Sequence, residues 1–414
     1  MDIRHTSMTA FQSSAHLEKK IRMKRRGFLL SATAAATAGM TALSAPPIGA
    51  NANAAVRIGA VLPLSGPLNI FGQQARLGLE LALAEIRESG GFLDQDIEID
   101  YRDEASVPGR AEAAATELIA NPATLAIAGP ITSASRNALS PVVEASGVPL
   151  LYATDYEGGD CGPRLFYFNS VPNQTATPLM SHLMDQSSGP VFFLGADYIW
   201  PHRMFDACGR VVADRLGSIV GREFVPLDGL SDYTPILAKI KSSGAGILVL
   251  ALPGAAQEDF ITAAQSAGWF SNLTVGLLGS PVLYSKALQA AGLTAVSCVP
   301  FVESDPSASV QAFVERVRKL ATVDGPVSAY VATHYSALLA LRAACEAIGS
   351  ATREAATSGL SGLDYAAPNG MLTLDPSSNH TTLRMYVTQV SNAGLQILQD
   401  PHLMAPEAAC VAGA

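Results

Sequence analysis

The chain has 414 residues, of which 49% are hydrophobic and 15% are charged. Residues 1–54 hold seven Lys or Arg and two acidic residues, so the remainder holds 20 basic and 34 acidic residues and has a net charge of −14. With this negative charge, residues 55–414 should repel nucleic acids and anionic membrane surfaces. We therefore expect a small neutral or zwitterionic partner and no nucleic acid.

The N-terminal segment has the pattern of an export signal. The motif "RRGFL" at 25–29 is typical of twin-arginine signals, and the Ala-rich apolar stretch after it, about 17 residues, is short for a membrane span. Small residues offer a cleavage site near Ala54, so residues 1–54 are predicted to be an N-terminal extension and signal peptide. A membrane anchor is the alternative, and Met1 and Met23 both remain candidate starts. The sequence predicts a periplasmic protein.

Beyond the leader, buried strands alternate with amphipathic helices, which is typical of parallel, doubly wound sheets. The first unit has predicted strands at 56–64, 96–104, 124–130 and 148–154, with helices at 71–91, 109–121 and 134–147. The same rhythm restarts in segments 189–198, 201–217, 218–227, 233–244, 245–252 and 254–268. This second unit is of similar size, so two Rossmann-like lobes are predicted.

The last third of the chain adds helices at 307–321 and 328–349, and a tail at 368–390 that alternates like paired antiparallel strands. No low-complexity linker separates the lobes, so we expect the chain to cross between them through short hinge segments. The predicted fold is α/β, with two lobes of parallel sheet joined by a multi-strand hinge. The predicted boundaries are 55–172 with 300–375 for lobe 1, and 173–299 with 376–414 for lobe 2.

Five cysteines lie far apart in the sequence: Cys161, Cys208, Cys298, Cys345 and Cys410. An odd number cannot all pair within the chain, and neither a C-x-x-C motif nor metal-ligand spacing is present. Buried free thiols are the favoured interpretation. One pair can oxidise after export, and the sequence leaves open which one. We expect no metal and no cofactor.

Polar and aromatic residues gather where three predicted strands end. The loops are "GPITSAS" at 129–135, "ATDYEGGDCGP" at 153–163 and "GADYIW" at 195–200. In an open α/β sheet, ligands bind beyond the carboxyl ends of the strands. Two of these loops belong to the first lobe and one to the second, so they would face each other across a ligand-binding cleft.

The residues at these positions resemble a known family. "GAVLPLSGPLNIFGQQARLGLELALAEIRESGG" is similar to the opening of type I periplasmic solute-binding proteins of the leucine-binding superfamily. The motifs "TSASRNALSPV", "YATDYEG", "VPNQTATPL", "FFLGADYIWP" and "APNGMLTLD" resemble, in order, the branch that binds urea and short-chain amides. That branch includes urea-transport binding proteins and the amide sensor of the aliphatic amidase operon. The resemblance covers nearly all of residues 55–400.

The resemblance implies four ligand-binding residues. The serine of the amide sensor's first loop falls on Ser133, and the tyrosine and threonine of its "YAT"-like segment fall on Tyr152 and Thr154. The tyrosine of its second-lobe loop falls on Tyr198. Each has a structural alternative: a helix N-cap for Ser133, core packing for Tyr152 and a turn for Thr154.

This sequence departs from the branch at three positions. Ile131 replaces an aromatic residue, Asp155 replaces the proline after the threonine, and Trp200 replaces a second aromatic residue. Trp200 is therefore a further candidate, as cleft wall or as lobe packing. These changes leave the cleft framework intact and bear on the identity of the ligand.

Hydroxyls walled by aromatic faces can satisfy the N–H donors and the carbonyl of urea or an amide, and such a site rejects ligands that leave a polar group unpaired. An amino acid would also need a carboxylate for its ammonium group. Asp155, Glu157 and Asp197 can supply one, so this alternative stays open, although residues of this kind at a loop are usually solvated.

Enzyme interpretations are disfavoured, because the sequence has no G-x-S-x-G elbow, P-loop or H-E-x-x-H motif. The sequence predicts an extracytoplasmic solute-binding protein that takes urea or a short-chain amide and delivers it to an ABC permease in the inner membrane. The alternatives are an amino-acid-binding protein and a cytoplasmic ligand-sensing regulator of the same fold, and the leader argues against the latter.

Overall fold

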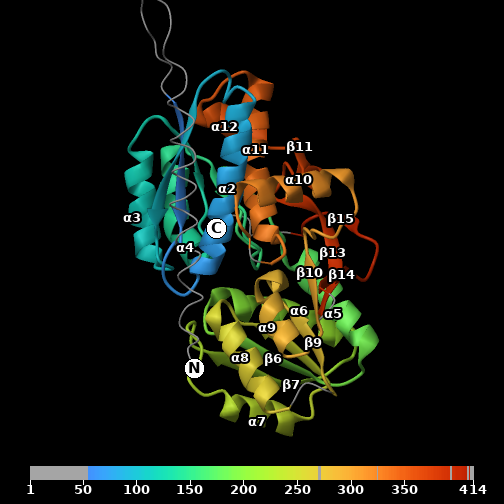
Figure 1. Ribbon diagram of the computed structural model, residues 1–414. Helices are drawn as coiled ribbons and strands as arrows, with labels where there is room; N and C mark the ends of the chain where they lie inside the picture. Colours follow the sequence, from blue (N-terminus) through green and yellow to red (C-terminus); the bar gives the residue numbers. More distant parts are fainter. Residues whose placement is uncertain (1–54, 269–271, 324, 392–393, 408–409, 411–414) are drawn as a thin grey trace, which may run out of the picture.

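The computed structural model describes residues 55–268, 272–323, 325–391, 394–407 and 410, and they form two lobes (Figure 1). The first lobe is built on a five-stranded parallel sheet with the order β2-β1-β3-β4-β5. Its strands are β1 (Val56–Leu62), β2 (Ile97–Asp103), β3 (Thr124–Ala128), β4 (Leu150–Tyr152) and β5 (Leu165–Tyr167). The predicted signal peptide lies outside the described residues.

The second lobe is built on a parallel sheet with the order β10-β9-β8-β6-β7. Its strands are β6 (Val191–Ala196), β7 (Ile219–Val225), β8 (Ile247–Ala251), β9 (Thr274–Leu277) and β10 (Ala295–Val299). Beyond β10 the sheet extends toward the first lobe through antiparallel strands, in which β13 pairs with β10, and β12, β14 and β15 pair with β13. These strands, with β11 paired to β12, are β11 (Asp364–Ala367), β12 (Gly370–Leu374), β13 (Thr381–Ser391), β14 (Gly394–Ile397) and β15 (His402–Met404).

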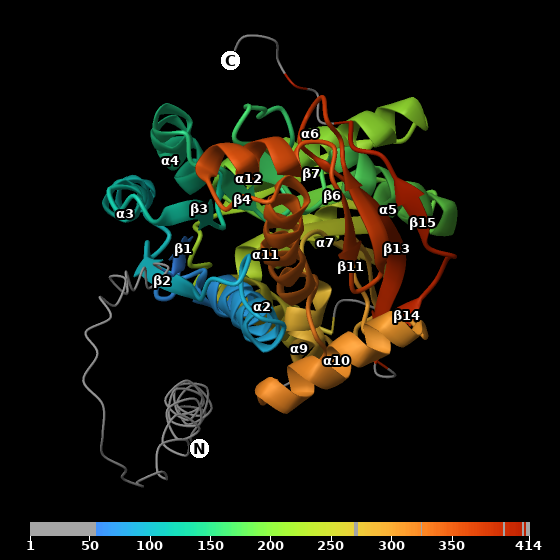
Figure 2. The same ribbon diagram turned by 90° about the horizontal axis from the view of Figure 1, so that it is seen from above.

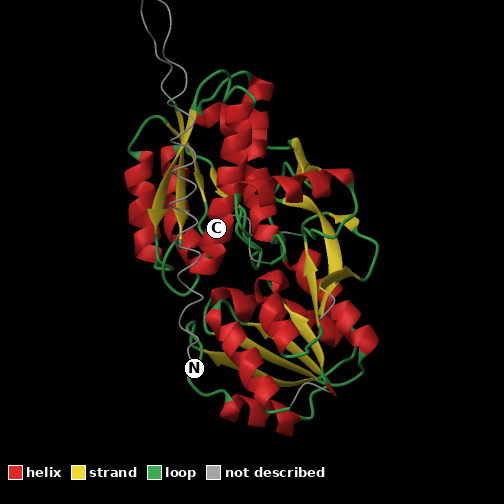
Figure 3. Ribbon diagram, viewed as in Figure 1, coloured by secondary structure: helices red, strands yellow, loops and turns green. Residues whose placement is uncertain are grey.

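Helices cover the sheets of both lobes (Figure 3). The first lobe carries α2 (Asn69–Glu88), α3 (Pro108–Ile119), α4 (Ser133–Ser146), α10 (Ala308–Leu320), α11 (Ala329–Ile348) and α12 (Arg353–Leu360). The second carries α5 (Pro172–Gln186), α6 (Ile199–Asp214), α7 (Thr234–Ser243), α8 (Ala255–Ser266), α9 (Ser285–Ala290) and the 3-10 helix η3 (Pro281–Tyr284). In the described part of the chain, none of the helices has the length and apolar character needed to span a bilayer.

Helix α11 is the most buried helix of the first lobe, and it lies alongside α2 (Figure 2). Most of its side chains from Ala329 to Leu341 are buried, as the apolar run in its sequence requires. Gly78 of α2 permits the close approach, because a Cβ there would collide with the carbonyl oxygen of Val331. This packing holds Tyr330, near the start of α11, against the interlobe cavity described below.

The chain crosses between the lobes three times, from β5 to α5, from β10 to α10 and from β12 to β13. The first and third crossings are hydrogen-bonded to each other: the Tyr167 N–H donates to the Asn379 carbonyl over 2.9 Å, and the Thr381 hydroxyl donates to the Tyr167 carbonyl over 2.8 Å. At the second crossing, the Asn369 amide donates to the Pro300 carbonyl over 2.7 Å. The predicted lobe boundaries remain our proposal for how the chain divides at these crossings.

The predicted α/β fold with two lobes of parallel sheet is confirmed. The segment 272–291, for which the sequence suggested no element, holds β9, η3 and α9. One disulfide joins Cys161, in the loop after β4, to Cys410 near the C-terminus. The other three cysteines are free and buried, as the sequence suggested.

Candidate functional site

A cavity of about 40 Å³, room for a few water-sized molecules, lies between the two lobes. It is bordered by loops that follow β1, β3 and β4 in the first lobe and β6, β8 and β9 in the second, and by α11. The carboxyl ends of two parallel sheets therefore meet at one place, as the position of the polar loops predicted. The lining residues are Leu68, Phe71, Ile131, Thr132, Ser133, Thr154, Asp155, Tyr198, Trp200, Leu252, Pro253, Leu278, Gly279, Ser280, Tyr284 and Tyr330.

Ser133 and Thr154 form part of the first-lobe wall, and both are buried. Ser133 is the first residue of α4, whose N-cap is Thr132. The Ser133 hydroxyl donates to a carboxylate oxygen of Glu157 over 2.7 Å, and its oxygen accepts from Arg136 Nη1 over 3.3 Å. The Thr154 hydroxyl donates to the Pro130 carbonyl over 3.5 Å. The Ser133 hydrogen is thus engaged within the protein, the Thr154 hydrogen makes only a long contact, and both oxygens keep lone pairs for a ligand.

Asp155 is a buried carboxylate on the same wall, with 7% of its surface exposed. Its Oδ1 accepts from the Tyr330 hydroxyl over 2.7 Å, whereas its Oδ2 is buried without a partner. Burial raises the pKa of Asp155 to about 6, and the Tyr330 bond opposes that shift. Among the described residues, no Arg, Lys or His lines the cavity. The expectation that a loop aspartate is solvated is wrong here, because the loop after β4 turns inward under α11.

Three of the candidate residues do not line the cavity: Tyr152, Asp197 and Glu157, the last of which lines a wider cleft. Tyr152 is fully buried behind the wall, and its hydroxyl donates to the Ile131 carbonyl over 2.8 Å, which fixes the loop that carries Ser133. Asp197 is exposed and pairs with His202 over 2.8 Å at the border of a wider cleft. None of these three side chains borders the cavity.

The second-lobe wall holds Tyr198, the N-cap of α6, and Trp200 in its first turn. The Trp200 indole Nε1 is buried without a partner. Ser280, which follows β9, is 3% exposed, and its hydroxyl also has no partner. Sequence reasoning missed Ser280, Tyr284 and Tyr330. The only local signal was for Ser280, which ends the short apolar segment "TVGLLGS" that the sequence analysis did not identify as a strand.

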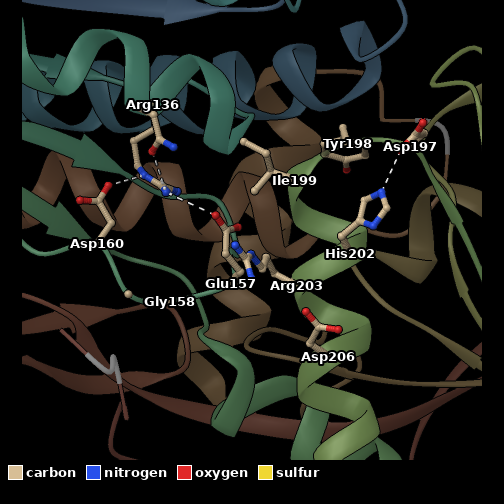
Figure 4. A pocket seen from close by; sticks show the side chains of 12 residues that line it. Arg136, Glu157, Gly158, Asp160, Asp197, Tyr198, Ile199, His202, Arg203 and Asp206 are labelled. Atoms are coloured by element: carbon tan, nitrogen blue, oxygen red, sulfur yellow. Dashed lines mark hydrogen bonds and ion pairs between the residues drawn. The ribbon is translucent and has the colours of Figure 1, made fainter. Parts of the chain in front are cut away.

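A wider cleft with a volume of about 1050 Å³ adjoins the cavity and shares Tyr198 with it (Figure 4). It is lined by charged groups of both lobes: Arg136, Glu157 and Asp160 from the first, and Asp197, His202, Arg203 and Asp206 from the second. Arg136 is buried and pairs with Asp160 over 2.8 Å and with Glu157 over 3.5 Å. Its guanidinium also stacks on Tyr152 and Tyr156, so these contacts fix the loop beneath the cavity.

Glu104 supports α4 from below and has an expected effect on stability. It is fully buried, one carboxylate oxygen accepts from the Ser135 hydroxyl over 2.9 Å, and the other has no partner. Burial raises its pKa to about 7, so the folded protein holds a proton that the unfolded chain releases. The stabilisation is complete below the unfolded pKa of 4.5 and is lost as the pH rises through 7.

We therefore expect Glu104→Gln to raise the free energy of unfolding at pH 8 by about 1–3 kcal/mol and to change it little at pH 4.5. Denaturant titration at both pH values measures this. Glu112→Gln, on the exposed face of α3, is the matched control and should have no effect at either pH. An equal effect of Glu104→Gln at both pH values would show that the buried charge is not responsible.

The described residues hold no group of three or more His, Cys, Asp or Glu side chains placed to bind a metal. The arrangement instead offers hydrogen-bond acceptors, donors and aromatic faces around one small space. Such a lining suits the binding of a small polar solute.

Comparison with known proteins shows which family shares this architecture. Residues 55–395 match the model of the periplasmic binding protein family. The Leu/Ile/Val-binding protein homolog 6 of Brucella abortus (strain 2308) is 25% identical over 364 residues, covering 86% of this chain and 93% of that protein. The family model spans most of the chain, which is the evidence for membership.

Two solved structures share the fold. A solute-binding protein of an ABC transporter from R. palustris, in complex with 4-hydroxybenzoate, has a TM-score of 0.76 at 22% identity and covers 85% of this chain and 98% of that one. The leucine-, isoleucine-, valine-, threonine- and alanine-binding protein from Brucella ovis, in a closed conformation, has a TM-score of 0.72 at 17% identity, covering 84% and 94%. With its two lobes and the cavity between them, the chain belongs to the periplasmic binding protein family.

Proposed function

We propose that the protein is the solute-binding component of an ABC importer and that it captures a small solute with an amino group, best an amino acid with an apolar side chain. The observation that carries this proposal is the buried Asp155 Oδ2, which has no partner in a cavity that none of the described cationic side chains lines. A buried carboxylate is stabilised when a cation pairs with it. An ammonium group supplies that cation. The cavity of about 40 Å³ would have to widen, by separation of the lobes, to admit a whole amino acid, whose side chain would then lie against the apolar part of the wall.

The charge of Asp155 also bears on which of the solutes described for the structural neighbours this protein can take. The R. palustris protein is described with 4-hydroxybenzoate, whereas the Brucella ovis protein is described as binding amino acids. A benzoate placed in this cavity would bring a carboxylate but no ammonium group to pair with Asp155, and no described cation lines the cavity to compensate. We therefore expect amino acids to bind and benzoates to be rejected.

Urea or a short-chain amide is the second candidate. It is favoured by Ser133 and Thr154, whose oxygens can accept from ligand N–H groups, by the aromatic faces of Tyr198 and Trp200, and by the small volume. A neutral amide would leave the charge of Asp155 unpaired, unless that carboxylate is protonated when the ligand binds. This is why we place it second.

The proposed importer role rests on the family to which the chain belongs and on the predicted signal peptide. We propose that a twin-arginine signal exports the protein, that it works in the periplasm, and that its partner is an ABC permease of the inner membrane. A cytoplasmic regulator with the same fold would not need the leader. The solute class is therefore the part of the proposal that most needs an experiment.

A thermal-shift screen of the purified mature chain tests the solute class. We expect L-alanine or L-leucine to stabilise the protein by about 2.7 kcal/mol at 100 times the dissociation constant, and benzoate to have no effect. Ser133→Ala and Thr154→Val should each weaken the binding of these amino acids by about 5- to 150-fold, because each removes an acceptor.

Asp197→Asn is the matched control, because Asp197 lies outside the cavity, and it should bind like the wild type. Stabilisation by urea or acetamide without any effect of amino acids would move the second candidate to first place. Stabilisation by benzoate alone would overturn both.

A further inference from the structure

We propose that Arg203 stabilises the closed arrangement of the lobes: its guanidinium pairs across the wide cleft with the carboxylates of Glu157 and Asp160 when the lobes are together. Arg203 is then a positioning residue, because it acts on closure and does not touch the solute. Such a pair stabilises the closed form with any solute, so it does not depend on the solute class proposed above.

Arg203 differs from the other charged groups on its side of the cleft in having no partner within the described part of the chain. His202 hydrogen-bonds to Asp197 over 2.8 Å, and Asp206 pairs with Arg222 over 2.7 Å. Arg203 is exposed, and no described residue holds its guanidinium by a hydrogen bond or an ion pair. Its charge is therefore available to a partner on the facing lobe.

The first-lobe side of the cleft has an excess of negative charge. Glu157 and Asp160 share one cation, Arg136, whose nitrogens lie 3.5 Å and 2.8 Å from their carboxylate oxygens. Two carboxylates and one guanidinium leave one negative charge, and both acidic side chains border the cleft. The Asp160 side chain is 29% exposed and uses Oδ2 for Arg136, so its Oδ1 can accept from a second cation. A positive charge from the second lobe neutralises this cluster.

Helix α6 carries both Arg203 and part of the cavity wall. Tyr198 and Trp200 at the start of the helix line the cavity, whereas Arg203, in the second turn, lines the wide cleft (Figure 4). The facing loop at 153–163 likewise carries Asp155 of the cavity wall together with the two carboxylates. A movement that closes the cavity therefore also brings the cation toward the carboxylates, and separation of the lobes withdraws it.

An ion pair that exists only when the lobes are together shifts the equilibrium between the open and closed forms. At an exposed or half-exposed position, such a pair changes the equilibrium by about two- to fivefold. Because it acts on closure, it raises the affinity for any solute by the same factor. It slows the release of the solute and has little effect on its capture.

Paramagnetic relaxation tests the pair in the absence of solute. A nitroxide label on the rim of one lobe relaxes the amides of the facing rim in proportion to the fraction of closed molecules. We expect Arg203→Gln to lower that fraction about two- to fivefold, and Arg203→Glu to lower it further, because like charges then face each other. Arg203→Lys keeps the charge and should keep most of the closed fraction.

Three controls isolate the charge. Arg210→Gln removes an exposed arginine farther along α6 that does not line the cleft, and it should leave the closed fraction unchanged. Salt at about 500 mM should lower the closed fraction of the wild type toward that of Arg203→Gln and change the variant little. In a Glu157→Gln background, which keeps an acceptor for the Ser133 hydroxyl, Arg203→Gln should have a smaller effect.

Stopped-flow binding of L-alanine, L-leucine, urea and acetamide supplies a second readout. For each probe that binds, Arg203→Gln should raise the dissociation rate about two- to fivefold and leave the association rate nearly unchanged, because the pair forms only as the lobes close. Thermal unfolding of each variant checks that it folds.

An unchanged closed fraction in Arg203→Gln, or an equal loss with and without Glu157→Gln, overturns the ion pair. A loss in the association rate alone assigns Arg203 to electrostatic attraction of the solute and overturns it as well. If none of the four probes binds to the wild type, the proposed solute class fails, and the closed fraction measured without solute still decides the role of Arg203.

Discussion

Asp155→Asn is expected to weaken the binding of L-alanine and L-leucine by about 100- to 1,000-fold at pH 7, because it leaves the ligand's ammonium group buried without a counter-charge. The substitution keeps the size of the side chain and an acceptor oxygen for the Tyr330 hydroxyl, so the fold should not change. Calorimetry measures the loss, with Asp197→Asn as the control that removes an acidic charge outside the cavity. A loss no larger than that of Thr154→Val would favour the neutral amide.

The same carboxylate predicts a pH dependence. Burial raises the pKa of Asp155 to about 6 in the ligand-free protein, and the neighbouring charge of Glu157 contributes in the same direction. Only the ionised form pairs with an ammonium group, so the affinity should be complete above pH 7 and fall about tenfold by pH 5. Asp155→Asn should remove this dependence. An affinity that is constant from pH 7 to pH 5 would contradict the role of the ionised carboxylate.

The disulfide between Cys161 and Cys410 should be a large contributor to stability. It joins residues 249 positions apart, and a cross-link that closes so long a loop restricts the unfolded chain strongly. We expect its reduction to lower the free energy of unfolding by about 2–5 kcal/mol. Thermal unfolding with and without dithiothreitol measures this.

The control for the disulfide is the double variant Cys161→Ser, Cys410→Ser, which should unfold at the temperature of the reduced wild type and should not respond to dithiothreitol. The three free cysteines are buried, so they do not complicate the comparison. Equal stability of the oxidised and reduced wild type would contradict the expected contribution. Since disulfides persist in oxidising compartments, a stabilising one would also support export.

Three residues that the sequence singled out in the first lobe line the cavity, whereas Tyr152 lies behind its wall. Ser133, Thr154 and Asp155 lie within a few residues of the end of an apolar strand, and in a parallel sheet that position brings them to one edge. The local sequence could not show that Asp155 is buried. Its contact, Tyr330, lies 175 residues later in the chain, on the long helix α11.

Only part of the second-lobe wall was predicted, because a sequence pattern identifies a strand only when the strand is long enough to show it. Tyr198 and Trp200 follow a strongly apolar strand, whereas Ser280 follows β9, which has only four residues and a glycine in it. So short a segment has too little periodicity to be recognised as a strand. The disulfide pairing could not be predicted either, since spacing does not specify partners so far apart in the chain.

The three chain crossings determine which relative movement the lobes can make. A single tether would let one lobe rotate about any axis, whereas three neighbouring strands of chain, two of them hydrogen-bonded to each other, resist sliding and twisting. We therefore expect the lobes to move by a rotation about the line through the crossings. Each closure would then bring Trp200 and Ser280 back to the same position opposite Asp155. The distance between two dyes, one on the rim of each lobe, should therefore change in one way when ligand binds. Such a labelled protein could serve as an optical sensor of its ligand.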